Sequence, residues 1–114
     1  MSYPLRGDIY WVNLDPVVGT EIAKTRPTVI VSNNIGNEFS TGVIVAPLTS
    51  SGQDKVYPFE VLIPSSEGGL PHPSKALLDQ IRTIDKRRLG RHIGTLSQER
   101  MREIDQVIRR SLAV

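Results

Sequence analysis

Residues 14–34 read LDPVVGTEIAKTRPTVIVSNN. They contain the last residue of one predicted β-strand, a polar connecting loop, and the whole of the next predicted strand. The second strand, residues 28–32, is apolar at three consecutive positions, which is typical of a strand buried on both faces. Arg26 stands just before it and is followed by Pro27, whose ring fixes its own φ and biases the preceding residue toward an extended backbone. The sequence therefore predicts a cation held on a stiff segment beside a polar loop. An ordinary surface loop that ends in a solvated arginine is the competing interpretation.

The composition is that of one small folded domain. The chain has 114 residues, of which 39% are hydrophobic and 23% charged, so we expect a single domain over residues 1–114. It has no cysteine, which excludes disulfides, thiolate zinc sites and cysteine nucleophiles. Neither a membrane-spanning apolar run nor a signal-peptide pattern is visible, and we expect a cytoplasmic location. The net charge of +2 permits a polyanionic partner without demanding one.

Short apolar runs separated by turn formers predict a mainly β chain. The predicted strands cover residues 8–14, 28–32, 41–47, 55–63, 75–83 and 92–96, although the composition of 75–83 would equally allow a helix. A single helical turn capped by Asn33 or Asn34 is expected after the second strand. We expect a long loop over residues 64–74, and a turn or short 3₁₀ segment over residues 84–91.

A helix is predicted at the carboxyl end. Ser97 is a suitable N-cap, and the helix is expected to continue to about Leu112. Met101, Ile104, Ile108 and Leu112 recur at helical spacing and form one apolar stripe. The fold class is therefore α+β and mainly β, a small bent or barrel-like sheet with a helix packed on it. Strands this apolar in a short chain also suggest burial against a second copy.

Several kinds of site find no support in the sequence. His72 and His92 are far apart and belong to no cluster with metal-ligand spacing, so no metal is expected. An acid–base pair of these two histidines is conceivable, but the sequence cannot bring them together. There is no glycine-rich phosphate loop and no Gly-x-Ser-x-Gly motif. The basic run at residues 86–88 is more typical of a solvated turn than of a nucleic-acid patch.

Arg26 and Thr49 remain as candidate site residues. Arg26 precedes one buried strand, and Thr49 follows another, at residues 41–47. If these strands pair antiparallel, the start of one lies beside the end of the other, and the two side chains converge. A guanidinium beside a hydroxyl suits a phosphate, because arginine matches phosphate oxygens with two hydrogen bonds.

A set of short motifs in a specific order carries a resemblance to a known family. The chain has RGDIY at 6–10, LDPVVGTE at 14–21, KTRP at 24–27, VSNN at 31–34, VAPLTS at 45–50, LLDQIRTIDKRRL at 77–89 and IGTL at 93–96. In this it resembles the MazF/PemK toxins of type II toxin–antitoxin systems. The resemblance implies an SH3-like small barrel of the PemK/CcdB-like toxin fold with a C-terminal helix, and a homodimer. It also implies sequence-specific cleavage of single-stranded mRNA without a metal ion or other cofactor.

The resemblance also implies site residues. The family's catalytic arginine and threonine fall on Arg26 and Thr49, and its conserved acidic loop residue falls on Glu21. Family residues that contact RNA fall on Ser74 and Gln80, and Lys24 and Ser50, which neighbour the catalytic positions, are grouped with them. One branch of the family uses an arginine and an aspartate near residue 79, but Leu77 replaces that arginine here, so the pair is not carried over.

The chemistry of RNA agrees with such a site. A 2′-OH lies next to each scissile phosphate, so the substrate supplies its own nucleophile and the enzyme must orient it and neutralise developing charge. A fixed cation and a hydrogen-bond donor suffice for this. The hypothesis is that Arg26 stabilises the transition state, Thr49 positions the phosphate, and Glu21 accepts the 2′-OH proton or orients Arg26.

Two alternatives of other classes remain open at this stage. One is a toxin of the same fold that poisons DNA gyrase instead of cleaving RNA, although the chain's last residues, SLAV, include no aromatic residue. The other is a noncatalytic RNA-binding barrel, against which the aromatic content of 5% argues. The resemblance further implies a cognate MazE-like antitoxin, whose acidic tail covers the groove at Arg26 and Thr49.

Overall fold

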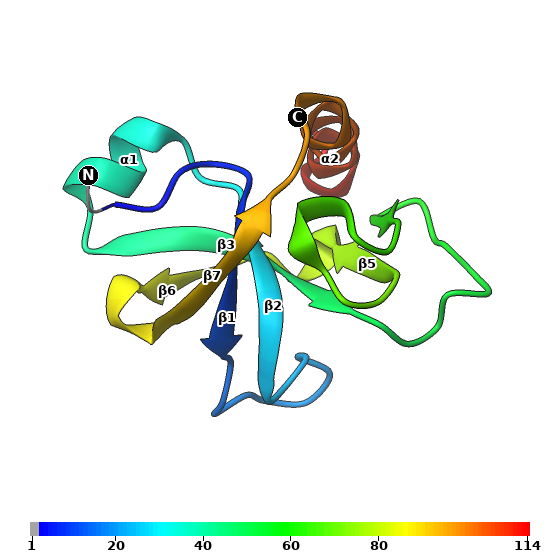
Figure 1. Ribbon diagram of the computed structural model, residues 1–114, viewed down its shortest axis with the longest axis horizontal. Coiled ribbons are helices and arrows are strands. Elements are labelled where there is room, and N and C mark those ends of the chain that lie inside the picture. Colours follow the sequence, from blue (N-terminus) through cyan, green and yellow to red (C-terminus); the bar gives the residue numbers. More distant parts are fainter. Residues whose placement is uncertain (1–2) are drawn as a thin grey trace.

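The computed structural model describes residues 3–114 as one strongly bent antiparallel sheet with a helix against it (Figure 1). The strands are β1 (Asp8–Asn13), β2 (Thr25–Ile30), β3 (Gly42–Thr49), β4 (Glu60–Ile63), β5 (Ser74–Leu77), β6 (Arg82–Asp85) and β7 (Leu89–Thr95). The helices are α1 (Asn34–Phe39) and α2 (Gln98–Leu112), with 3₁₀ turns η1 (Glu67–Gly69), η2 (Leu78–Gln80) and η3 (Lys86–Arg88). This confirms the predicted mainly β fold with a C-terminal helix.

The strand order is β4-β5-β3-β2-β1-β7, and β6 also pairs with β3. The first half of β3 pairs with β6, and its end pairs with β5, at Leu48 opposite Ala76 and Thr49 opposite Lys75. β3 thus forms the centre of the sheet. In the described residues β4 and β7 are the two ends of the strand path and do not pair with each other.

Two apolar clusters cover the two faces of the sheet. Val29 belongs to a cluster that includes Ile104 of α2, whereas its neighbour Ile30 belongs to a second cluster with Val12 and Val45. Successive side chains of a strand point to opposite faces, so a continuous apolar run is what two covered faces require. The predicted burial of the strand that follows Arg26 is therefore confirmed.

Both helices begin at the expected residues. The Asn33 side chain caps α1 by accepting a hydrogen bond from the Gly36 N–H, and the Ser97 side chain caps α2 through the Arg100 N–H. The predicted apolar stripe of α2 is partly wrong. Leu112 is 53% exposed, while Val107, which was not in the predicted stripe, is buried at 5%. The contact with the sheet ends before the last turn of the helix.

Several predicted boundaries are corrected by the structure. β2 spans Thr25–Ile30 rather than residues 28–32, so Arg26 is its second residue instead of lying ahead of the strand, and β3 continues through Thr49. β4 keeps only the last four residues of the predicted strand at 55–63. The strand predicted at 75–83 is two strands separated by η2, because Leu78 turns inward there and is fully buried. β7 starts three residues earlier than expected, at Leu89.

Candidate active site

The site lies where β2 begins and β3 ends. These strands pair antiparallel with Thr28 opposite Pro47, and the same register continued by two residues puts Arg26 opposite Thr49. Residues directly opposite each other in an antiparallel pair project from the same face of the sheet. Two residues separated by 23 positions in the sequence thus belong to the same rim of the sheet.

Arg26 is half-buried and anchored at one point only. Its Nε donates a hydrogen bond of 2.7 Å to the carbonyl of Ala23, while its backbone belongs to β2 opposite Val12 of β1. Within residues 3–114, its two terminal nitrogens make no hydrogen bond and no ion pair. The guanidinium is therefore held in place by one nitrogen while the two that form a fork remain available for an anion.

Thr49 is buried and its hydroxyl is held by Ser51. The Thr49 Oγ1 accepts a hydrogen bond of 3.2 Å from the Ser51 N–H and lies 2.8 Å from the Ser51 Oγ. A hydroxyl has one proton and two acceptor positions. When Ser51 donates through both groups, the acceptor positions of Thr49 are filled and its own proton is free for a ligand. Nothing in the sequence beyond an Ser-rich segment pointed to Ser51.

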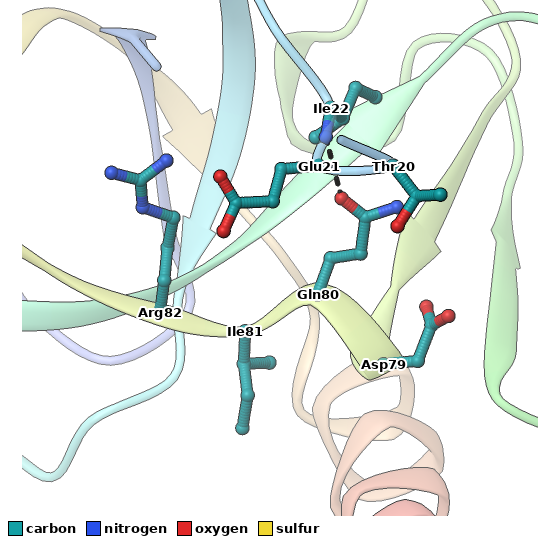
Figure 2. Close-up of a pocket in the computed structure, with 7 residues that line it drawn as sticks. All are labelled: Thr20, Glu21, Ile22, Asp79, Gln80, Ile81 and Arg82. Atoms are coloured by element: carbon teal, nitrogen blue, oxygen red, sulfur yellow. Dashed lines mark hydrogen bonds between the residues drawn. The ribbon is translucent and has the colours of Figure 1, made fainter. Parts of the chain in front are cut away.

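Glu21 and Gln80 line a pocket of about 340 Å³ between the β1–β2 loop and η2 (Figure 2). The Gln80 Oε1 accepts a hydrogen bond of 2.7 Å from the Ile22 N–H, which fastens the loop to the sheet. Glu21 accepts a hydrogen bond of 2.7 Å from the Val18 N–H, and its carboxylate turns toward the Arg82 side of the pocket (Figure 2). Glu21 makes no hydrogen bond or ion pair with Arg26 in the described residues, so the predicted orienting contact is not formed.

The loop between β1 and β2 is closed at its neck. The Leu14 N–H donates to the Lys24 carbonyl at 3.0 Å, and the Lys24 N–H donates to the Asp15 carboxylate at 3.1 Å. Lys24 has a φ of 74°, in the left-handed region that side chains other than glycine rarely adopt. The Lys24 side chain is exposed, two residues before Arg26 in the chain.

Ser50 and Ser74 lie at a second pocket, which they share with Arg26. Its volume is about 200 Å³, and Ser50 is exposed at its edge. Ser74 is only 5% exposed, and its Oγ donates a hydrogen bond of 3.1 Å to the carbonyl of His72. The structure thus groups Arg26, Ser50 and Ser74 at one pocket and Glu21 and Gln80 at the other.

The segment that follows Thr49 is held by a buried ion pair. Lys75, opposite Thr49 in the β3–β5 pairing, places its Nζ 2.9 Å from the Glu60 carboxylate, and both side chains are less than 10% exposed. The same amine donates to the Lys55 carbonyl at 3.1 Å. This pair ties the 50–60 loop to the strand that lies beside Thr49.

The two histidines have separate surroundings. His72 lines the pocket that contains Arg26, whereas His92 lies 3.4 Å from the Asp8 carboxylate and packs edge-on against the Tyr10 ring. Within residues 3–114, no three His, Asp or Glu side chains gather as a metal site would require.

Arg82 is a residue that the sequence interpretation missed. It lines the pocket of Glu21 and donates a hydrogen bond of 3.2 Å to the Leu14 carbonyl.

Comparison with known proteins gives consistent matches over nearly the whole chain. A family described as "PemK-like, MazF-like toxin of type II toxin-antitoxin system" matches residues 5–112. The chain is 43% identical to Endoribonuclease EndoA of Bacillus subtilis (strain 168) over 109 residues, which are 96% of this chain and 94% of that protein. The crystal structure of MazF from Deinococcus radiodurans superposes with a TM-score of 0.86 at 25% identity and full coverage of both chains. An endoribonuclease in complex with its cognate antitoxin, from a mycobacterial species, superposes with a TM-score of 0.80 at 27% identity, over 97% of this chain and 96% of that one.

Proposed function

The chain belongs to the PemK-like, MazF-like toxins of type II toxin–antitoxin systems, and from this premise we propose that it is a sequence-specific endoribonuclease that cleaves single-stranded mRNA without a metal ion. The bond is broken by the neighbouring 2′-OH, which leaves a 2′,3′-cyclic phosphate and a 5′-OH. The observation that supports this most strongly is the antiparallel register of β2 and β3, with Thr28 opposite Pro47, because its continuation by two residues would bring Arg26 opposite Thr49.

Arg26 holds the scissile phosphate and stabilises the transition state. Its two free terminal nitrogens match two phosphoryl oxygens, and the guanidinium supplies a permanent positive charge. The anchor of its Nε on Ala23 means that little reorganisation is needed when negative charge grows on the phosphorus.

Thr49 donates one hydrogen bond to the same phosphate. The Ser51 N–H occupies one acceptor position of the Thr49 oxygen, and when the Ser51 hydroxyl donates to the other, the Thr49 proton is left for the phosphate. With the phosphate fixed by both residues, the 2′-oxygen attacks in line, a bond from it to phosphorus forms, and the bond to the 5′-oxygen breaks. Glu21 takes the proton that the 2′-OH loses, and the 5′-oxygen takes up a proton from water.

Glu21 is the proposed acceptor of the 2′-OH proton. One of its carboxylate oxygens is used by the Val18 N–H, which leaves the other for the substrate. Because Glu21 lies on the β1–β2 loop, it reaches the RNA backbone only when that loop lies over the bound RNA. Gln80 and Lys24 act on the same loop, Gln80 by its bond to Ile22 and Lys24 by its charge near the RNA backbone.

The proposed assembly is a homodimer that is inhibited by a MazE-like antitoxin encoded with it. One similar structure is of an endoribonuclease with its cognate antitoxin, and another is described as MazE–MazF from Deinococcus radiodurans. An acidic antitoxin segment laid over Arg26 and Thr49 would occupy the place of the RNA phosphate.

No helix within residues 3–114 has the length and apolar character needed to cross a membrane. The proposed location is the cytoplasm, where its mRNA substrate is.

The test is cleavage of a 5′-labelled single-stranded RNA by the purified protein in EDTA. We expect cleavage at a short sequence, with cyclic phosphate ends that acid opens. Arg26→Ala and Thr49→Ala are expected to lower the single-turnover rate, by roughly 100- to 1,000-fold for the arginine. Arg102→Ala and Thr41→Ala are matched controls at exposed positions and should cleave normally. Undiminished cleavage by Arg26→Ala would reject its role.

The same incubation separates the alternatives. A toxin that acts on DNA gyrase leaves the RNA intact and inhibits supercoiling in a gyrase assay. A noncatalytic RNA-binding barrel retards the RNA in a gel without shortening it. A requirement for divalent ions would contradict the mechanism given above.

A further inference from the structure

A pocket of about 200 Å³ adjoins Arg26 on its side of the rim and is unlike the larger pocket at Glu21. Its walls are mostly apolar, from Pro27, Leu48 and Leu70, of which the two leucines are buried at 1% and 2%. Two aromatic side chains, Trp11 and His72, also line it. At this size it is below the roughly 300 Å³ of pockets that enclose drug-sized ligands, so it suits one small ring system.

The charges around the two pockets differ. Within residues 3–114, the smaller pocket is lined by Arg26 and by no carboxylate, whereas the larger one is lined by two carboxylates, Glu21 and Asp79, and one cation, Arg82. A group attached to a phosphate is therefore favoured at the smaller pocket, because the phosphate can rest on the Arg26 guanidinium at the pocket's edge. An apolar, aromatic-lined cavity beside a phosphate-binding cation is the arrangement that holds an unpaired base.

We propose that this pocket binds one unstacked nucleobase of the RNA, adjacent to the phosphate held by Arg26, and that His72 is a residue that determines which base is accepted. This rests on the proposed function and deepens it. The base would lie against Trp11 and His72, which both line the pocket and carry aromatic rings on which a base can stack, and the imidazole nitrogens can also form hydrogen bonds with a base edge.

His72 is presented on a rigid segment. It stands between Pro71 and Pro73, which restrict the backbone on both sides, and the buried Ser74 hydroxyl donates to its carbonyl at 3.1 Å. The imidazole itself remains exposed at the pocket. A side chain on a stiff backbone loses little freedom on binding, which favours discrimination between ligands of similar size.

Trp11 allows the pocket to be tested independently of cleavage. It is the only tryptophan in the chain, so tryptophan fluorescence, excited selectively over that of the three tyrosines, reports on this pocket. Short 2′-O-methyl oligonucleotides lack the attacking hydroxyl and bind without reaction. We expect them to quench Trp11, and His72→Ala to weaken binding roughly ten-fold by loss of one stacking partner. His92→Ala, the same change at a histidine outside the pocket, should bind normally. Binding detected by anisotropy with unchanged Trp11 fluorescence would overturn the proposal.

A second experiment identifies the base. After the cleavage sequence is mapped on a random RNA pool, each position near the cut is replaced in turn by an abasic nucleotide. His72→Ala is expected to slow cleavage of the intact RNA and to have no further effect when the contacted base is absent. It should also relax the preference at that position, while His92→Ala leaves it unchanged. An effect of His72→Ala that is equal on every abasic RNA would overturn the proposal. If the unmodified protein cleaves no RNA at all, it is the proposed function that fails.

Discussion

The buried ion pair beside Thr49 gives the most quantitative prediction. Lys75→Met keeps most of the side-chain volume but removes the charge that neutralises Glu60. It also removes the hydrogen bond to the Lys55 carbonyl. The Glu60 carboxylate keeps one donor, the Tyr57 N–H at 3.0 Å, in a place where water reaches less than a tenth of either side chain. The variant therefore leaves a charge that is only partly satisfied.

The magnitude follows from this burial. Removing one partner of a buried pair typically costs about 3–5 kcal/mol, and the remaining bond from Tyr57 places this case near the lower end, about 3 kcal/mol. For a domain of 114 residues, each kcal/mol shifts Tm by roughly 4 °C, so we expect a fall of roughly 12 °C. The double variant Lys75→Met/Glu60→Gln removes both charges and should recover most of this loss.

Urea unfolding followed by circular dichroism measures both variants, at one protein concentration because assembly would change the apparent stability. Lys86→Met, whose amine only reaches the Glu38 carbonyl at the surface, is the matched control and should change stability by less than about 0.5 kcal/mol. A loss below about 1 kcal/mol for Lys75→Met, or a double variant no better than the single one, would refute the reasoning. Such results would mean that water, or hydrogen-bond donors of a rearranged loop, stabilise the Glu60 carboxylate in place of Lys75.

Three further predictions concern the site and its surroundings. Arg26→Lys keeps the charge but not the two-pronged donor, so we expect a single-turnover rate roughly 10- to 100-fold below normal but above that of Arg26→Ala; equal rates for both variants would show that geometry alone matters. Gln80→Ala removes the bond to the Ile22 N–H and should raise hydrogen exchange at that amide, with KM for RNA affected more than kcat; unchanged exchange would contradict this fastening role. Burial, and to a smaller extent the Asp8 carboxylate, raise the pKa of Tyr10, so the stability that the neutral phenol contributes at neutral pH should be lost as pH rises above about 10. Asp8→Asn should lower the pKa of Tyr10 only in part, which ¹³C NMR of the tyrosine ring measures.

Local patterns were sufficient for much of the fold. The caps at Asn33 and Ser97 follow from side chains that accept hydrogen bonds from nearby N–H groups, a short-range property. The burial of Val29 and Ile30 on opposite faces follows from the alternation of side chains along a strand. The antiparallel pairing of their strand with β3 was only a condition in the sequence analysis, and the structure fulfils it.

Where the prediction failed, distant groups outweighed local preference. Residues 55–59 have the composition of a strand, yet they form a loop, in which Pro58 has no N–H to donate to a strand partner and the Lys55 carbonyl accepts a hydrogen bond from the Lys75 amine. There Tyr57 and Phe59 stack on each other at 5.5 Å between ring centres. The uniform strand predicted over residues 75–83 is interrupted for a similar reason, since Leu78 is buried among residues from other elements.

The sequence by itself determined which chemical groups are present, which short segments extend or coil, and where a permanent cation sits on a stiff backbone. Only the tertiary structure decided what each group touches: the Ser51 hydroxyl on Thr49, Gln80 on the β1–β2 loop, and His72 beside Arg26 rather than beside His92. The physical reason is range. Backbone preferences and caps act over a few residues, whereas pockets and strand registers depend on segments far apart in the chain, whose contacts form only when the whole core is packed.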